Sequence, residues 1–236
     1  MTETNKAVVI LSGGLDSTTC MAVARDAGYD VWPLTFFYGQ KHSIELESAK
    51  RVAAHYGCQD RHFIANLNGI IRGSALTDAD KEIPVNRLET EMSSEIPVTY
   101  VPARNIIFLS IALSYAESID AQSIWIGVNA LDYSGYPDCR PEFIESFQQV
   151  INKGTVAGAH GKGIQIEAPL QHLTKAEIVK LANRLQAPLL HTHSCYQGTD
   201  PACGVCDSCQ LRIKGFQEAG VRDPIEYAIP INWDVV

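Results

Sequence analysis

The sequence predicts an α/β fold built on an open parallel sheet with helices on both faces. As far as residue 168, short apolar runs typical of buried strands alternate with segments of helical periodicity. This alternation indicates parallel strands joined by helices. In addition, the first apolar run leads through two glycines directly into a helical segment. The expected strands are 7–11, 31–37, 60–65, 123–128 and 164–168.

The first three helical segments have recognisable features. Segment 15–27 ends near Gly28, and segment 41–56 is followed by Gly57 in the position of a C′ residue. Segment 105–119 is apolar nearly all round, which predicts a buried helix.

Two later helices begin at identifiable residues. Pro141 occupies the first turn of segment 141–152, a position that proline favours. Thr174 and Glu177 form a capping box that opens segment 174–185. The regular pattern then stops, and we expect no further helix or strand.

Length and composition favour one main domain with an appendage. The chain has 236 residues, a net charge of −8 and a pI of about 5.3, and this acidic balance disfavours large nucleic acid partners. No apolar run approaches the roughly 20 residues that span a bilayer, and no signal peptide pattern is present, so a cytoplasmic location without membrane partners is expected. We divide the chain into a main domain, 1–189, with an irregular insertion at about 66–100, and a C-terminal segment, 190–236.

The junction after the first strand predicts an anion-binding site. Exposed N–H groups and partial positive charge at a helix start attract anions, and glycines let the backbone approach a phosphate. Hydroxyl groups can donate to phosphate oxygens. The segment is not a Walker A loop, because no Gly-Lys-Ser/Thr follows. An ordinary glycine turn capped by Ser or Asp is the alternative. The junction reads Ser12-Gly13-Gly14-Leu15-Asp16-Ser17-Thr18 and follows Leu11.

Two cations lie where a helix dipole disfavours them. Arg104 is at the start of the helix that follows Pro102, and Lys175 lies in the first turn behind Thr174. A cation at a helix start is electrostatically unfavourable, which indicates that each side chain faces an anion such as phosphate. The alternative for both is a solvated side chain.

The stretch after strand 123–128 is rich in tyrosine and carboxylate groups. It lies beyond the carboxyl end of a strand, where open parallel sheets bind ligands. Tyr133 and Tyr136 can stack on a flat ring, while Asp132 and Asp138 can accept hydrogen bonds from a purine-like base. The same residues also suit an ordinary turn.

The end of strand 31–37 carries a second polar group at the same edge of the sheet. Gln40 and His42 lie there, and either could contact a nucleotide. Capping of the following helix explains them equally well.

Four of the seven cysteines fall within fifteen residues and predict a metal site. Four thiolates suit the tetrahedral shell of structural zinc. An iron–sulfur cluster is the alternative, although no fourth cysteine followed by proline completes that pattern. A full shell leaves no open position, so the expected role is structural, and His191 and His193 are not needed as ligands. The cluster is Cys195, Cys203, Cys206 and Cys209.

These motifs resemble those of a known superfamily and of one family within it. The Ser-Gly-Gly-x-Asp-Ser loop resembles the pyrophosphate-binding loop of the ATP pyrophosphatase, or PP-loop, superfamily, which implies an adenine nucleotide alpha-hydrolase-like fold and transfer of AMP to a substrate oxygen. The order of all the motifs resembles the 7-cyano-7-deazaguanine synthase family of queuosine precursor biosynthesis. The most specific string is Ser-Gly-Tyr-Pro-Asp-Cys-Arg at 134–140.

The family resemblance implies a reaction and a set of site residues. It implies an ATP-dependent ligase that converts 7-carboxy-7-deazaguanine and ammonium to the 7-nitrile through an adenylated carboxylate and an adenylated amide. It also implies a structural zinc in each subunit, Mg²⁺ with ATP, and a homodimer. Lys175 and Arg104 would offset phosphate charge, and Asp132 and Asp138 are candidate bases by residue type. Implied nucleotide contacts are Leu11, Ser12, Gly13, Gly14, Leu15, Asp16, Ser17, Thr18 and Gln40; implied substrate contacts are Asp132, Tyr133, Ser134, Tyr136, Asp138 and Arg140.

Two other functions are compatible with parts of the pattern. An adenylating enzyme that transfers sulfur to tRNA shares the superfamily loop, although it would need a basic face. A zinc-bearing protein that holds nucleotide without turnover is a second alternative. The intact loop together with the two cations disfavours it.

Overall fold

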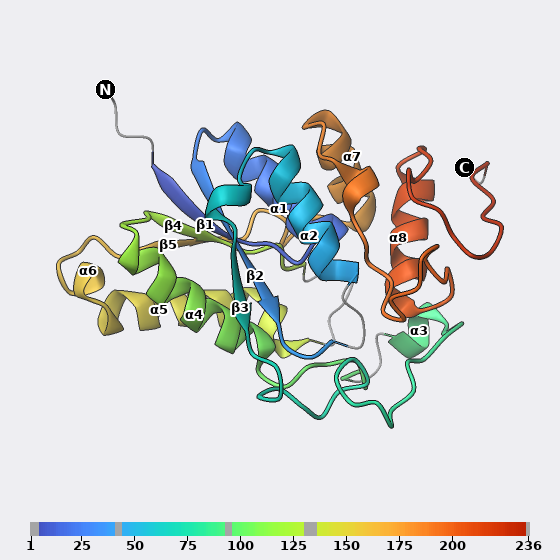
Figure 1. Cartoon of the computed structure of the whole chain (residues 1–236), viewed down its shortest axis with the longest axis horizontal. Coiled ribbons are helices and arrows are strands. Elements are labelled where there is room, and N and C mark those ends of the chain that lie inside the picture. Colours follow the sequence, from blue (N-terminus) through green and yellow to red (C-terminus); the bar gives the residue numbers. More distant parts are fainter. Residues whose placement is uncertain (1–4, 41–43, 93–95, 130–135, 235–236) are drawn as a thin grey trace.

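The core of the molecule is one sheet of five parallel strands. The computed structural model describes residues 5–40, 44–92, 96–129 and 136–234 (Figure 1). The strand order is β3-β2-β1-β4-β5, and all pairs are parallel, so the predicted open parallel sheet is confirmed. The strands are β1 Lys6–Ile10, β2 Asp30–Phe37, β3 Phe63–Asn66, β4 Ser123–Trp125 and β5 Gln165–Glu167.

Helices cover both faces of this sheet, as the sequence predicts. One face carries α1 (Leu15–Asp26), α2 (Ile44–His55) and α7 (Lys175–Arg184). The other carries α4 (Arg104–Ser118) and α5 (Pro141–Gly154), as Figure 1 shows. The remaining helices are α3 Glu89–Met92, α6 Val156–Ala159 and α8 Asp207–Glu218, with short 3-10 turns at Gln59–Arg61, Pro137–Cys139 and Leu189–His191.

The central strand β1 joins two hydrophobic cores. Its side chains alternate between the faces: Val8 and Ile10 belong to the core under α4 and α5, while Ala7 and Val9 belong to the core under α1, α2 and α7. Burial of a valine or isoleucine side chain contributes about 1.5–3 kcal/mol. The strand is therefore held rigidly on both sides, and so is the loop that leaves its end.

Three expectations from the sequence are wrong in detail. The helix at 105–119 is buried on one face only, and Ile106 is 45% exposed, because the sheet covers one side of α4. The strand expected at 123–128 ends at Trp125. The C-terminal segment contains α8, which packs on α7; its helical pattern was obscured by Cys209 and Gly215 within it.

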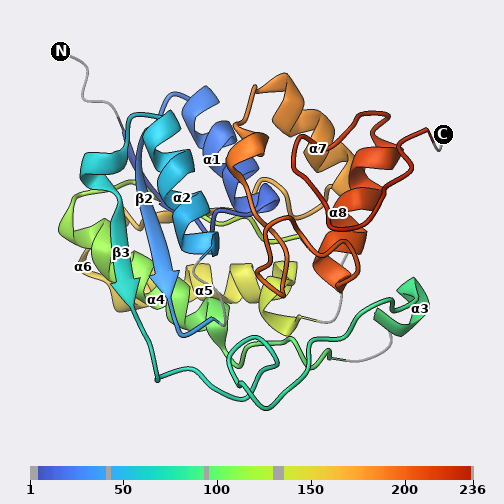
Figure 2. The same ribbon diagram turned by 45° about the vertical axis from the view of Figure 1, so that its right-hand side comes forward.

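The insertion connects the main domain to the C-terminal segment. Its described residues, 67–92 and 96–103, run along the ends of the strands mostly as loops, and the short helix α3 among them lies near α8 (Figures 1 and 2). Asn86 N donates to the Val205 carbonyl at 2.8 Å, and Arg87 pairs with Asp207 at 3.3 Å. These two contacts attach the middle of the insertion to the C-terminal segment, despite its irregular backbone.

A partly buried histidine, His62, lies beside the end of β1. Thr35 Oγ1 donates to the Leu11 carbonyl at 2.6 Å and lies 2.7 Å from His62 Nε2. Because the threonine hydrogen is already used, His62 donates from Nε2 as a neutral ring. Burial, helped by the charge of Lys50, lowers the pKa of His62 from 6.5 to about 4.

We expect the free energy of unfolding to fall as the pH is lowered from about 6.5 to about 4. In this range the unfolded chain takes up a proton on His62 that the folded chain does not. His62→Gln, which keeps a donor without a titrating ring, should flatten this part of the profile in urea unfolding. The exposed His160→Gln is the control and should leave the slope unchanged. An identical slope in His62→Gln would contradict the prediction.

No helix in the described parts of the chain is long and apolar enough to cross a membrane.

Candidate active site

A cavity of about 290 Å³ opens at the carboxyl ends of the central strands. The strand order reverses between β1 and β4, and a crevice forms at such a switch point in open parallel sheets. Its walls come from the loop after β1, the end of β2, the starts of α2, α4 and α7, the end of β4, and the C-terminal segment. Residues predicted from separate parts of the sequence therefore line one cavity, namely those of the loop after β1 together with Gln40, Arg104, Tyr136 and Lys175.

The loop after β1 has the form of an anion site. Gly14 is the N-cap residue of α1, so the N–H groups of the first helical turn face the cavity. Ser12 Oγ lies 2.9 Å from Ser17 Oγ, and Gly14 N donates to Ser12 Oγ at 3.3 Å. These contacts fold the loop on itself at the mouth of the cavity.

Glycine is required at two positions here because backbone atoms of neighbouring elements lie where a Cβ would be. Gly13 has a φ of +86°, and a Cβ there would lie 2.5 Å from Ala49 N and 2.5 Å from the Glu45 carbonyl oxygen of α2. A Cβ on Gly127, after β4, would lie 3.0 Å from Ser17 N. The loop is consequently clamped between α2 and the end of β4.

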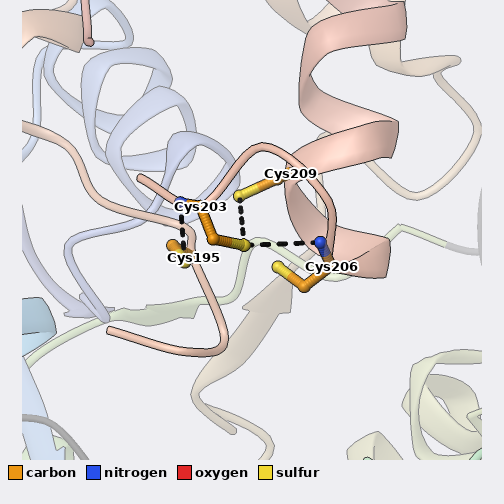
Figure 3. A group of neighbouring side chains, drawn as sticks. All are labelled: Cys195, Cys203, Cys206 and Cys209. Carbon is orange, nitrogen blue, oxygen red and sulfur yellow. Dashed lines mark hydrogen bonds between the residues drawn. The ribbon is translucent and has the colours of Figure 1, made fainter. Parts of the chain in front are cut away.

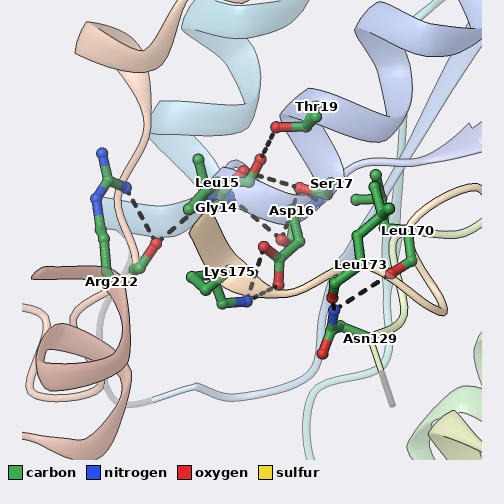
Figure 4. A network of polar contacts seen from close by, with 12 residues as sticks. Gly14, Leu15, Asp16, Ser17, Thr19, Asn129, Leu170, Leu173, Lys175 and Arg212 are labelled. Atoms are coloured by element: carbon green, nitrogen blue, oxygen red, sulfur yellow. Dashed lines mark hydrogen bonds and ion pairs between the residues drawn. The ribbon is translucent and has the colours of Figure 1, made fainter. Parts of the chain in front are cut away.

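Lys175 faces the loop and is paired with a loop carboxylate. Its Nζ lies 2.9 and 3.0 Å from the two carboxylate oxygens of Asp16, and the lysine side chain is 14% exposed (Figure 4). The stem of Lys175 lies against Gly215 of α8, where a Cβ would be 2.4 Å from Lys175 Cγ. The capping box of Thr174 and Glu177 is confirmed. The sequence analysis identified the cation but not its partner.

Arg104 lines the cavity from the first turn of α4. Burial opposes its charge, but the polar groups around it, led by Tyr38 and Tyr136, keep the pKa of Arg104 above its usual value. The guanidinium therefore stays charged inside the cavity. Burial raises the pKa of the neighbouring Glu45 carboxyl, against the opposing influence of Arg104 and His193.

The described residues of the string 134–140 lie in different surroundings: one lines the cavity, one is buried at a helix start and one is exposed. Tyr136 lines the cavity and its hydroxyl lies 3.0 Å from Thr99 Oγ1. The buried Asp138 accepts from Asn105 N at 3.0 Å through Oδ2 and so caps the start of α4. Arg140 is exposed and precedes α5. Asp132, Tyr133 and Ser134 lie outside the described residues, as does His42.

The remaining predicted nucleotide contacts differ in their exposure to the cavity. Leu11, Leu15 and Gln40 line it. The Gln40 amide accepts from Tyr38 N at 2.9 Å and donates to the Phe36 carbonyl at 3.3 Å, so it holds the end of β2. Thr18 is fully buried in α1, and its Oγ1 has no hydrogen-bond partner among the described residues.

The sequence analysis did not assign Glu45, Arg212, His193 and Ser194 to the site, although all four line the cavity. Glu45 comes from α2, Arg212 comes from α8, and His193 and Ser194 come from the segment before the cysteine cluster. Only packing brings the last three to the loop, because they are distant from it in the sequence; Ser194, for example, is 179 residues away from Leu15. The local sequence around them carries no signal for phosphate or nucleotide binding.

The four clustered cysteines converge on one point (Figure 3). All are buried, and their sulfur atoms lie within 4.8 Å of one another. Cys203 N donates to Cys195 Sγ and Cys206 N donates to Cys203 Sγ, each at 3.4 Å. Hydrogen bonds from Cys206 and Cys209 lower the pKa of Cys195. Four sulfur donors within reach of one centre fit a tetrahedral metal ion.

Comparison with known proteins gives one consistent result. The family model described as "Queuosine biosynthesis protein QueC" matches residues 6–220. The chain is 58% identical to a 7-cyano-7-deazaguanine synthase of Acetivibrio thermocellus, over 94% of this chain and 97% of that one. It is 56% identical to 7-cyano-7-deazaguanine synthase 2 of Desulfitobacterium hafniense, over 94% and 93%.

Among solved structures the likeness is more distant. A 4-thiouridine synthetase in complex with RNA and ATP superposes with a TM-score of 0.49 and 19% identity, over 91% of this chain and 50% of that one. A likeness at this level carries no argument about function.

Proposed function

This chain belongs to the family of the queuosine biosynthesis protein QueC, and we propose that it acts as an ATP-dependent 7-cyano-7-deazaguanine synthase. Its substrates in this proposal are 7-carboxy-7-deazaguanine, ammonium and ATP. One observation carries the proposal: the phosphate loop, the cation Lys175 and the aromatic wall at Tyr136 line a single cavity. The family identity over most of the chain favours this function over transfer of sulfur to tRNA.

The arrangement suits two rounds of adenylation. In the first, a carboxylate oxygen of the acid attacks the α-phosphorus of ATP and pyrophosphate leaves. Ammonia then attacks the carbonyl carbon, a C–N bond forms, AMP departs with the C–O bonding pair, and loss of one N–H proton leaves an amide. In the second round, the amide oxygen attacks the α-phosphorus of another ATP and pyrophosphate leaves. That oxygen then departs with AMP, taking the C–O bonding pair, and loss of two N–H protons leaves the nitrile.

Residue roles in this proposal follow from position and charge. Lys175 and Arg104 approach the cavity from different helices and would stabilise negative charge on the phosphates. Tyr136 would wall in the deazapurine, together with Asp132, Tyr133 and Ser134. For Asp138 we propose that it holds the start of α4, and with it Arg104, in place, because its carboxylate caps that helix. Arg140, which is exposed, would contact the deazapurine substrate from outside the cavity.

The four-cysteine cluster is proposed as a structural zinc site. Cys195, Cys203, Cys206 and Cys209 supply a full set of four sulfur ligands, which leaves no position for substrate. Zinc there would fix the start of α8, because Cys206 is the N-cap residue of that helix. Mg²⁺ is proposed to enter with ATP and to neutralise phosphate charge.

Three further expectations remain predictions. We expect a homodimer, an enzyme that acts without nucleic acid, and a cytoplasmic location. Free ammonium is the expected nitrogen donor. Sedimentation analysis and activity in the absence of RNA test the first two.

Analysis of nucleotide products tests the proposed reaction. Purified protein is incubated with ATP, Mg²⁺ and ammonium, with and without 7-carboxy-7-deazaguanine. We expect release of AMP and pyrophosphate that depends on the acid, and formation of the nitrile without RNA. ADP and phosphate as products would contradict adenylation. Activity that requires tRNA would favour the sulfur-transfer alternative.

Replacement of a clustered cysteine should remove the metal. Cys206→Ala leaves three sulfur ligands, and we expect most of the bound zinc to be lost and the melting temperature to fall. Metal analysis of the purified protein measures the first effect. Cys20→Ala, which alters a buried thiol in α1 away from the cluster, is the control and should keep its zinc. Retention of zinc by Cys206→Ala, or iron in the wild-type protein, would contradict the assignment.

A further inference from the structure

Ser194 belongs to the C-terminal segment but lies at the phosphate loop. A Cβ built on Gly14 would be 3.6 Å from Ser194 Oγ, and Ser194 lines the same cavity as Gly14. The preceding residue fastens the segment there, because His193 N donates to the Gly13 carbonyl at 2.9 Å. The C-terminal segment therefore closes one side of the loop.

The hydrogen bonds of Ser194 leave its own hydrogen uncommitted. Ser194 Oγ accepts from Arg212 Nη1 at 3.2 Å and from Leu15 N at 3.5 Å. Both partners are N–H donors, and neither can accept a hydrogen bond. Among the contacts of the described residues, the hydroxyl hydrogen of Ser194 is thus free to point into the cavity.

The two serine hydroxyl groups of the loop itself are already committed. Ser17 Oγ donates to the Gly14 carbonyl at 3.2 Å, so the hydrogen in its 2.9 Å contact with Ser12 Oγ comes from Ser12. Ser12 and Ser17 would have to break these bonds before they could donate to a ligand. Ser194 would not.

Arg212 fixes Ser194 in this position. The arginine is 2% exposed and forms a two-pronged ion pair with Asp223, at 2.6 and 3.0 Å. Its Nη1 donates to Thr192 Oγ1 at 2.9 Å as well as to Ser194, and Figure 4 shows the guanidinium directed toward the start of α1. An arginine held at four points has little freedom, so the serine oxygen that it binds is fixed too.

A second polar atom of the same segment points to a ligand. His193 is 6% exposed and lines the cavity, and its Nε2 is buried with no hydrogen-bond partner among the described residues. Buried polar atoms are rarely left unpaired. Two adjacent residues, His193 and Ser194, thus bring unused hydrogen-bonding capacity to the loop.

We propose that Ser194 is a phosphate-binding residue of the ATP site, which donates its hydroxyl hydrogen to a triphosphate oxygen, and that Arg212 is its positioning residue. This inference rests on the proposed use of ATP by the same cavity. It gives the C-terminal segment a direct part in nucleotide binding, in addition to its metal site. The ligand class is a phosphoanhydride. We therefore expect the site to bind pyrophosphate in addition to ATP.

Ser194→Ala tests the assignment in the zinc-loaded protein. A hydrogen bond to a charged acceptor is lost, so we expect about a tenfold weaker affinity for ATP and for pyrophosphate by calorimetry. The KM for 7-carboxy-7-deazaguanine should stay within about twofold. Ser194→Thr, which retains a hydroxyl, should recover most of the affinity. Ser110→Ala, on an exposed part of α4, is the control and should match the wild type.

A double-mutant cycle separates positioning from general stability. Arg212→Lys cannot make the two-pronged pair, and we expect it to weaken ATP binding in the wild-type background. In the Ser194→Ala background it should weaken ATP binding no further.

Three outcomes would overturn the inference. They are unchanged ATP and pyrophosphate affinity in Ser194→Ala, an effect confined to the KM for the acid, and an equal loss of all affinities accompanied by loss of zinc. The proposed function fails separately, when the wild-type protein binds ATP but forms no nitrile. The binding measurements still decide the role of Ser194 in that case.

Discussion

Replacement of Lys175 by methionine is expected to lower kcat/KM for nitrile formation by about 10²–10³-fold. Lys175 Nζ lies 2.9 Å from Asp16 at the edge of the phosphate loop. Without the lysine, the loop loses a cation that offsets phosphate charge. The Asp16 carboxylate is also left unpaired beside the phosphates, where like charges repel. Both effects grow as negative charge builds up on the leaving pyrophosphate.

The measurement is steady-state turnover with release of pyrophosphate as the readout. Lys180→Met is the matched control, because Lys180 lies on the same helix α7 but is exposed. The control should keep wild-type kinetics, and both variants should melt near the wild-type temperature. A Lys175→Met enzyme with less than a tenfold loss would show that the cation acts mainly as the structural partner of Asp16.

Gly13→Ala is expected to destabilise the fold by about 2–5 kcal/mol and to abolish ATP binding. Gly13 has a φ of +86°, which an alanine adopts only with strain. Its Cβ would also lie 2.5 Å from backbone atoms of α2, at Ala49 N and the Glu45 carbonyl oxygen. Backbone atoms cannot move aside as a flexible side chain can, so either α2 or the phosphate loop must shift.

Gly28→Ala separates backbone strain from this close approach. Gly28 has nearly the same φ, +85°, but a Cβ there would meet nothing within 4 Å. We expect a loss of about 1–2 kcal/mol from the left-handed backbone alone, with ATP binding intact. Urea unfolding and calorimetry with ATP measure the two effects. Equal destabilisation of the two variants would contradict the role assigned to the contact with α2.

Much of the fold could be predicted because its signals are local. The run 7–11 and the glycine turn predicted β1 and the start of α1. The capping box at Thr174 predicted the start of α7. Each of these depends on residues within one or two turns of each other. The spacing of four cysteines likewise predicted a cluster that the structure brings together.

The predictions that failed concern features with weak or mixed local patterns. Cys209 and Gly215 in α8 obscured its helical periodicity, and an apolar run in α4 did not indicate which face would be covered. The role of Asp138 as a base stays a prediction. Its contact with Asn105 N, 33 residues away, shows in addition that it caps α4, which its residue type alone did not indicate.

The sequence by itself determined the order of strands and helices along the chain, the glycine loop after β1, the four-cysteine cluster and the family. Only the tertiary structure decided which side chains meet at the loop: Lys175 with Asp16 across 159 residues, and Ser194 with Leu15 across 179. The physical reason is a difference in range. Backbone preferences and caps act between near neighbours, whereas these pairs depend on the packing of distant elements, such as the close contact between Gly215 of α8 and Lys175 of α7.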